Sequence, residues 1–454
     1  MNHIQMQSIP IERWDALLQE APPAGCDAVE VYAYEDESFS VGLLDGEIDT
    51  YETNRSSGIG LRTDCGQIGA ASSQAPDQEP QALLQNAVES AAIVESEDAP
   101  YQRFFAGSPQ YAPLPAIDPR LPAMDAAQKI ALCRQLESLA LQADPHITRL
   151  EDCQLASSIY RSTLRNSLGL RVASERGYAI AYVSPIAEKD GEIKNGLAYD
   201  IARCVEELDL AKIAREAAED VMAQLGASSL PSGSYGVVFK NRAMISLLST
   251  FCSIFSADAA QKGMSLLAGK EGTRIASSAV QLLDLPMHPM SLLPSNYDGE
   301  GVATCRTAII QDGDLQTLLH NRKTAAKAGT QTTANASRTG LGGIMGVSPN
   351  NLVLQEGTQS CEQLFAHMHN GVYITHVSGL HAGANPVSGA FSLLSRGFVV
   401  QNGQLAQPID QITISGNFYE LLQGIQALGD DLDFATGSIG SPSVWVEQLT
   451  VAGK

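Results

Sequence analysis

The sequence of 454 residues has no long hydrophobic run and few basic residues. Nowhere do 18 apolar residues follow one another, so no transmembrane helix is expected. The start of the chain lacks the basic end and the apolar stretch of a signal peptide. With 29 Lys and Arg against 51 Asp and Glu, the formal charge is −22, which would repel nucleic-acid phosphates. We therefore expect a soluble, cytoplasmic protein that binds neither a membrane nor, directly, nucleic acid.

The eight cysteines are scattered, and no C-x-x-C pair occurs among them. This spacing does not fit a zinc finger. Dispersed cysteines in a long chain are typical of intracellular proteins, whose thiols stay reduced. We therefore expect free cysteines.

Length and patterning predict an α+β protein of about three domains. Six prolines between residues 100 and 122 exclude a regular helix or a central strand and indicate an extended connector. The expected divisions are an N-terminal α+β domain at 1–97, a Pro-rich connector at 98–122, a middle α+β domain at 123–227 and a β-rich C-terminal domain at 228–454. The first and second domains each repeat a helix, an antiparallel meander and a helix.

Hydrophobic periodicity places the individual elements. Helices are predicted at 11–20, 79–95, 124–143, 200–225, 241–260, 358–368 and 418–428. Strands are predicted at 28–34, 38–43, 47–52, 57–63, 67–72, 146–155, 157–164, 168–174, 177–184, 236–240, 301–310, 351–355, 371–377, 397–401, 411–415 and 443–451. The pair Asp45-Gly46 between two strands predicts a hairpin turn.

Several motifs of enzyme chemistry are incomplete. The pair Gly58-x-Gly60 lacks the third glycine of a dinucleotide loop, and Gly340-Leu341-Gly342-Gly343 lacks the lysine of a nucleotide P-loop. The nucleophile pattern G-x-S-x-G is absent, although Gly389-Ala390-Phe391-Ser392 is superficially similar. Structural turns are the favoured interpretation of all three segments.

A hydrolytic zinc site needs three protein ligands and an open position, and two histidines one helical turn apart supply two of them. Neither H-E-x-x-H nor H-E-x-x-x-H occurs. The alternative ligands are His367, His369, His376 and His381, and we favour ordinary surface or core histidines at these positions. The carboxylates of Asp298-Gly299-Glu300 could orient a substrate, but turn capping is favoured. The residues alone thus give no catalytic set.

A series of segments nevertheless resembles one family in order and spacing, from about residue 25 to the end. The segments are Leu44-Asp45-Gly46-Glu47-Ile48, Gly58-Ile59-Gly60-Leu61-Arg62, Gly66-Gln67-Ile68-Gly69-Ala70-Ala71, Asp298-Gly299-Glu300-Gly301-Val302, Ile309-Ile310-Gln311-Asp312-Gly313, Gly379 to Ser392, Gly397, Asn402-Gly403, Ile414-Ser415-Gly416-Asn417 and Ser441-Pro442-Ser443-Val444. Together they resemble the TldD/PmbA family. The resemblance implies helix and meander units followed by a β-rich domain of the PmbA/TldD type.

The resemblance also implies a division of labour between two chains. TldD-type members hold zinc on a His-Glu-x-x-x-His helix, whereas PmbA (TldE) members lack that helix motif and pair with them. By segment order the helix falls here at about 241–260, where the degenerate zinc-helix position is Ser249, Thr250, Phe251 and Cys252. We therefore expect no catalytic residue, no metal and no cofactor in this chain, with zinc in a TldD-type partner.

The family is known for cleaving unfolded or extended peptides, in microcin maturation and in degradation of an antidote protein. An older description, modulator of DNA gyrase, came with it, and the charge of −22 argues that any such link is indirect. The resemblance implies that this chain helps to enclose an extended peptide within a heterodimer or a homodimer, and strand addition to a sheet edge is one way to hold it. The peptide-contact candidates are His381, Asn385, Ser392, Asp298 and Glu300.

One departure from the family pattern is Ala390, where an acidic residue is usual. Two other hypotheses stay open. The chain could be a homo-oligomeric peptide-binding or scaffold protein without proteolysis. It could also be an autonomous metallopeptidase that uses the histidines named above.

Overall fold

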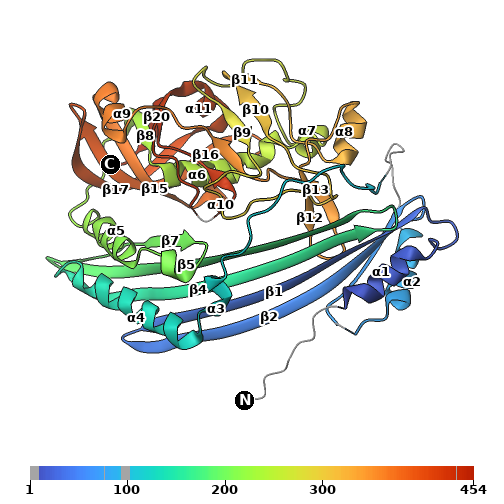
Figure 1. The fold of residues 1–454 in the computed structure, drawn as a ribbon. Coiled ribbons are helices and arrows are strands. Elements are labelled where there is room, and N and C mark those ends of the chain that lie inside the picture. Colours follow the sequence, from blue (N-terminus) through green and yellow to red (C-terminus); the bar gives the residue numbers. More distant parts are fainter. Residues whose placement is uncertain (1–9, 76, 94–102, 436) are drawn as a thin grey trace.

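The computed structural model describes residues 10–75, 77–93, 103–435 and 437–454. A long curved sheet from the first half of the chain lies beneath a C-terminal domain (Figure 1). Helices cover the opposite face of the sheet near its two ends (Figure 1). Within the described part of the chain, every helix is too short or too polar to cross a membrane.

The curved sheet is antiparallel, with strand order β3-β2-β1-β4-β5-β6 and with β7 also paired to β5. The strands are β1 (Ala28–Leu44), β2 (Glu47–Asp64), β3 (Ile68–Ser73), β4 (Ile147–Asn166), β5 (Arg171–Lys189), β6 (Glu192–Asn195) and β7 (Ala198–Ala202). The predicted hairpin turn is confirmed, since Asp45 and Gly46 both have positive φ (51° and 81°). Four pairs of separately predicted strands are instead the four continuous strands β1, β2, β4 and β5, because pairing continues through polar stretches such as Glu35–Glu37 of β1.

The predicted N-terminal and middle domains share this one sheet. Strand β1 pairs with β4 from Glu30↔Asn166 to Gly42↔Gln154. A division between them at the proline-rich connector therefore does not separate two sheets. The pairing joins strands more than 100 residues apart in the sequence, and the local pattern of neither strand predicts it.

The side chains of the sheet alternate between two environments. Odd-numbered residues pack against helices: Val31 contacts the cluster of Trp14 and Leu17, and Val41 lies in the cluster of Leu136. The helices are α1 (Ile11–Gln19), α2 (Pro80–Ala91), α3 (Arg120–Ala123), α4 (Ala126–Gln142) and α5 (Leu210–Met222). The helix predicted at 200–225 begins later than expected, because residues 198–202 extend the sheet as β7.

The C-terminal domain contains a closed ring of strands. Strands β17, β16, β15, β8 and β20 pair in this order, and β17 also pairs with the end of β20. Strand β18 pairs with the beginning of β20. The strands are β8 (Gly233–Phe239), β15 (Gly371–Ser378), β16 (Ala390–Gln401), β17 (Gln404–Asn417), β18 (Ile425–Leu428) and β20 (Val444–Ala452). A second sheet and a hairpin comprise β9 (Leu282–Asp284), β10 (Thr307–Gln311), β11 (Asp314–Leu315), β14 (Leu352–Leu354), β19 (Ile439–Gly440), β12 (Ala336–Thr339) and β13 (Ile344–Val347).

The helices of this domain are α6 (Asn241–Phe251), α7 (Ala257–Gln261), α8 (Arg322–Ala328), α9 (Cys361–Met368), α10 (Leu380–Gly383) and α11 (Phe418–Gly424). The single helix predicted at 241–260 is divided, because a 3-10 turn at Cys252–Phe255 separates α6 from α7. Helix α8 was missed; it starts at a capping box formed by Asn321 and Thr324. The α+β fold class is confirmed.

The hairpin β12–β13 fixes the C-terminal domain to the sheet. A side chain at Gly60 would place its Cβ 1.9 Å from the carbonyl oxygen of Leu341, and one at Gly58 would meet the Leu341 side chain at 2.6 Å. Only glycine lets the hairpin tip approach β2 this closely. The motif Gly58-x-Gly60 is thus a docking point between domains.

The expectation of free cysteines is wrong for one pair. Cys26 and Cys65 form a disulfide, whereas the other six cysteines are free. Cys26 precedes β1 and Cys65 follows β2, and Asp27 N–H donates to the Asp64 carbonyl at 2.7 Å. Pairing of the two strands therefore brings together cysteines that are 39 residues apart.

Candidate functional site

The degenerate zinc-helix position lies at the end of α6, and its polar groups are engaged locally. Thr250 donates its hydroxyl to the Ser246 carbonyl at 2.9 Å, and the Cys252 thiol donates to the Ser249 carbonyl at 3.2 Å. Burial raises the pKa of the Cys252 thiol, which favours the neutral form. These groups satisfy the helix and do not converge on a metal position.

Phe251 anchors this helix end in the core. Its ring stacks on Phe418 with centroids 4.5 Å apart and meets Phe391 edge-on at 6.3 Å. Phe391 adjoins Ser392 on β16, and the two side chains point to opposite faces of that strand, one buried and one exposed. The helix end and the glycine-rich segment at 379–392 are thereby neighbours.

His381, Asn385 and Ser392 belong to this segment and are all exposed. Asn385 accepts hydrogen bonds from the N–H groups of Val387 and Ser388 at 3.0 and 3.2 Å, so its carboxamide holds its own turn. Ser392 accepts a hydrogen bond from the Ser415 hydroxyl at 3.0 Å. Of the three, His381 is the one with no hydrogen bond to another described residue.

Large apolar side chains are exposed around this segment. Val387 is 44% exposed and Leu394 is 54% exposed, in the segment itself and on β16. Leu266 is 54% exposed, and its N–H donates to the Tyr419 hydroxyl at 3.2 Å. Gly389 lies against the same Tyr419 ring. The polar candidates therefore stand among apolar side chains of the kind that contact another chain or a ligand.

The other two candidates, Asp298 and Glu300, lie elsewhere, buried to 4% and 5% exposure. Asp298 accepts hydrogen bonds from the N–H groups of Glu300, Val302 and Ala336 at 2.9 to 3.0 Å. Glu300 accepts one from the Arg322 N–H at 2.9 Å. Both carboxylates therefore organise a turn and the strand beside it, in agreement with the favoured interpretation of capping.

Burial dominates the electrostatics of this pair. It raises the pKa of Asp298 and of Glu300 above their ordinary values, and the neighbouring Asp298 charge raises that of Glu300 further. Backbone N–H groups oppose the shift by stabilising the charged forms. The two carboxyls thus hold a proton at higher pH than exposed ones do.

A buried ion-pair network next to these carboxylates was not predicted. Glu30 of β1 contacts Arg62 of β2 at 3.1 Å and Arg338 of β12 at 2.7 Å. Arg338 also donates to the Gly299 carbonyl at 2.9 Å and lies over the Tyr32 ring. The network therefore joins the sheet to the C-terminal domain. Its only signal in the sequence was the alternation of charged and apolar residues in β1 and β2.

The histidines named as alternative metal ligands do not converge. His367 lies in the last turn of α9 and contacts Gln359 at 2.9 Å, and His369 follows the helix end with a φ of 64°. Within the described residues, the group of potential ligands close enough to share an ion is Asp118, Cys204 and Glu207. Arg120 contacts both of its carboxylates at 2.6 Å and neutralises them.

Comparisons with known proteins agree with the fold. Three family models of the PmbA/TldA metallopeptidases match in order: domain 1 at residues 29–92, the central domain at 119–225 and the C-terminal domain at 232–453. The Metalloprotease PmbA of Escherichia coli is 25% identical over 100% of this chain and 98% of its own length.

Solved structures match over almost the whole chain. A Thermotoga maritima protein, solved as a candidate modulator of a DNA gyrase, has a TM-score of 0.90 and 32% identity, with 97% of this chain and 99% of that one covered. TldE from Thermococcus kodakarensis has a TM-score of 0.88 at 23% identity, covering 97% and 100%. The architecture and the ordered domains define a metallopeptidase-type chain. It belongs to the PmbA/TldD metallopeptidase family.

Proposed function

We propose that this chain is the zinc-less subunit of a two-chain cytoplasmic metallopeptidase and that it helps to hold an extended peptide. A TldD-type partner would supply the zinc and the catalytic glutamate. The observation that carries the proposal is the end of α6. The helix that the family resemblance assigns to zinc is present and packed through Phe251, yet Ser249, Thr250 and Cys252 stand there in place of a His and Glu set.

The surroundings of that helix end support a contact with a second chain. Leu266, Val387 and Leu394 are exposed apolar side chains in or near the segment 379–392, whose Phe391 contacts Phe251 at that helix end. Their burial against a partner would be favourable by about 25 cal/mol for each Å² removed from water. His381 lies in the same region, and its exposed side chain has no hydrogen bond within the described part of the chain, so it could contact a peptide. This face is therefore our proposed site of subunit and substrate contact.

The test combines metal analysis with a peptidase assay. The purified full chain is analysed for zinc, and cleavage of an unfolded casein substrate is measured for the chain alone, for a zinc-bearing TldD-type relative alone and for the mixture. We expect no stoichiometric zinc in this chain and activity that rises on mixing. Stoichiometric zinc together with chelator-sensitive activity of the lone chain would overturn the proposal.

Oligomeric state separates the proposal from its main rival. Light scattering of the mixture should show a complex of both chains. A stable homodimer that binds casein, ignores the zinc-bearing relative and cleaves nothing would instead establish a peptide-binding scaffold.

A further inference from the structure

Part of the outer edge of β5 has no partner strand among the residues that the structure describes. Strands β6 and β7 pair with that edge over Ile186–Lys189 and Ala179–Val183. From Arg171 to Tyr178 the strand pairs only with β4 among the described residues. An unpaired edge presents N–H and C=O groups that can pair with another extended chain.

The direction of these backbone groups follows from their neighbours. The Leu170 carbonyl accepts from Asn166 N–H at 3.2 Å and Glu188 N–H donates to the His146 carbonyl at 2.9 Å, so even-numbered residues of β5 face β4. By antiparallel alternation, odd-numbered residues face outward. Ala173 and Glu175 are exposed, and on the outer side their backbone groups have no hydrogen bond within the described chain.

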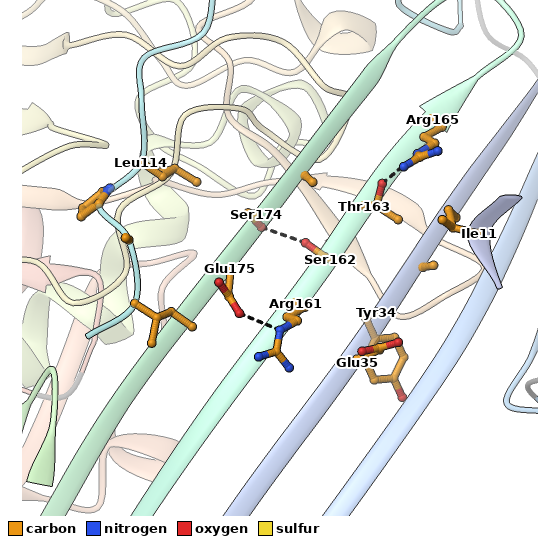
Figure 2. A pocket seen from close by; sticks show the side chains of 15 residues that line it. Ile11, Tyr34, Glu35, Leu114, Arg161, Ser162, Thr163, Arg165, Ser174 and Glu175 are labelled. Carbon is orange, nitrogen blue, oxygen red and sulfur yellow. Dashed lines mark hydrogen bonds and ion pairs between the residues drawn. The ribbon is translucent and has the colours of Figure 1, made fainter. Parts of the chain in front are cut away.

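A cavity of about 580 Å³ separates this edge from the connector at Leu114–Ile117. Figure 2 shows the connector passing outside β5, with Arg161 directed to Glu175 on the sheet. Neither Pro113 nor Pro115 has an N–H to donate to β5. The connector is instead held to the C-terminal domain, because Asn296 donates to the Ala112 carbonyl at 2.7 Å.

The sheet forms a shallow floor for this cavity. Ala33, Thr163 and Ala173 are in register on three adjacent strands and have small side chains. The row beside them is charged, with Arg161 between Glu35 and Glu175. A side chain entering here would meet a small apolar floor with polar groups at its rim.

A second cavity, of about 330 Å³, lies at the same strand on the opposite face of the sheet. Its lining includes Arg176, Tyr160, Ser295 and Tyr297, together with Arg338, which is paired with Glu30, and the buried Asp298, which accepts backbone hydrogen bonds. Arg176 donates to the Ser295 hydroxyl at 3.4 Å, and no described carboxylate lies within ion-pair distance of it. Its Nε and the Tyr297 hydroxyl are buried without a partner. Such groups are costly unless a ligand satisfies them.

We propose that an extended polypeptide segment binds as an added strand along Ala173–Glu175 of β5, with an acidic side chain directed to Arg176. Successive side chains of a strand point to opposite faces, so they would enter the two cavities in turn. Arg176 supplies the charge complementarity, because a carboxylate would engage its guanidinium and the Tyr297 hydroxyl. The choice of a peptide as the occupant rests on the proposed function. The site itself rests on the unpaired strand edge and the two cavities.

The first test measures binding to the full chain by fluorescence anisotropy. The probe is a labelled ten-residue peptide of Ser, Thr and Val with one central Glu, and its partner has Gln at that position. Two further versions carry N-methyl groups on alternate amides. We expect one N-methylated version to bind at least about ten-fold more weakly than the other, and the Glu peptide to bind about ten-fold more tightly than the Gln peptide.

The variant Arg176→Gln should abolish the preference for Glu, whereas Arg149→Gln, which removes an exposed arginine at the far end of β4, should retain it. Hydrogen exchange should show protection of Ala173 and Glu175 when the peptide is added. Equal affinity of both N-methylated versions, or no saturable binding, would overturn the added strand. A Glu preference that persists in Arg176→Gln would overturn the role of Arg176.

These outcomes are separate from those of the proposed function. Peptide binding at β5 with no activation of a zinc-bearing relative would leave this inference standing and remove the proposed function. Activation on mixing, with no exchange protection at Ala173 and Glu175, would do the reverse.

Discussion

The junction beneath the hairpin β12–β13 and the surface around α10 use polar side chains in opposite ways. At the junction, Glu30, Asp298 and Glu300 are buried and bonded to groups from distant parts of the chain. Around α10, His381 and Asn385 are exposed, and Asn385 bonds only within its own turn. Whether a polar residue in a motif supports the fold or contacts a ligand can therefore be judged only from its burial and its hydrogen-bond partners. The following predictions test this contrast.

The largest expected effect is at Glu30. The substitution Glu30→Ala leaves Arg62 and Arg338 buried beside an empty position, and breaking a buried pair in this way costs about 3–5 kcal/mol. Denaturant unfolding monitored by fluorescence measures the loss. The matched control is Glu37→Ala in the same strand, whose carboxylate is 34% exposed and paired with an exposed arginine; it should cost under about 1 kcal/mol. Equal effects of both would contradict a special role for the junction.

The next effect concerns the contact between β2 and the hairpin. The substitution Gly60→Ala places a methyl group against the Leu341 carbonyl, and such overpacking costs about 1–3 kcal/mol. Thermal unfolding should show a lower midpoint. The control Gly424→Ala meets only a Val446 methyl at 3.4 Å and should stay within about 0.5 kcal/mol. A neutral Gly60→Ala would show that the hairpin tip is free to withdraw.

On the α10 side, the exposed apolar residues should matter to assembly and not to folding. The substitution Leu394→Asp puts a charge into the proposed interface and should weaken binding of the zinc-bearing relative by about ten-fold or more, with unchanged thermal stability. Titration by isothermal calorimetry measures the affinity. Ile193→Asp, at a 59% exposed position on β6, is the control and should bind normally. A loss of stability in Leu394→Asp would indicate a structural role instead.

The sequence predicted several of the local elements, but it did not predict which distant residues lie together in the fold. The turn at Asp45-Gly46 and the helix that starts near Asn241 were predictable, because their signals are local. The pairing of β1 with β4 and the convergence of Glu30 with Arg338 were not, since 308 residues separate the latter two. The motif Asp298-Gly299-Glu300 was noticed, yet only its backbone partners show that it supports the fold. Arg176 carried no signal in the sequence, because the lack of a carboxylate partner for it among the described residues depends on which side chains the fold places around it.

A smaller effect is expected on the pH dependence of the free energy of unfolding, through Glu300. Because burial raises the pKa of Glu300, the folded state binds a proton that the unfolded state has released once the pH exceeds the ordinary value of 4.5. Stability from this group therefore falls as the pH rises from about 4.5 to the raised pKa of about 7, and it changes little above that pH. The side chain at position 300 cannot ionise in the variant Glu300→Gln. The free energy of unfolding of this variant, measured with denaturant, should therefore rise relative to that of the wild type by about 1 kcal/mol from pH 5 to pH 8. Glu447→Gln, at an exposed position on β20, should follow the wild type throughout.

The smallest effect concerns His381. If its imidazole makes one hydrogen bond to a bound peptide, the substitution His381→Ala should raise the KM of the mixed enzyme about five-fold, which corresponds to about 1 kcal/mol, and leave folding unchanged. His146→Ala is the matched control, because this histidine precedes β4 of the curved sheet and contacts Asp144, outside the segment 379–392. An unchanged KM in His381→Ala would place the peptide elsewhere. An increase confined to His381→Ala would identify an exposed residue of the motif as a contact, in contrast to Asp298 and Glu300, whose roles lie within the fold.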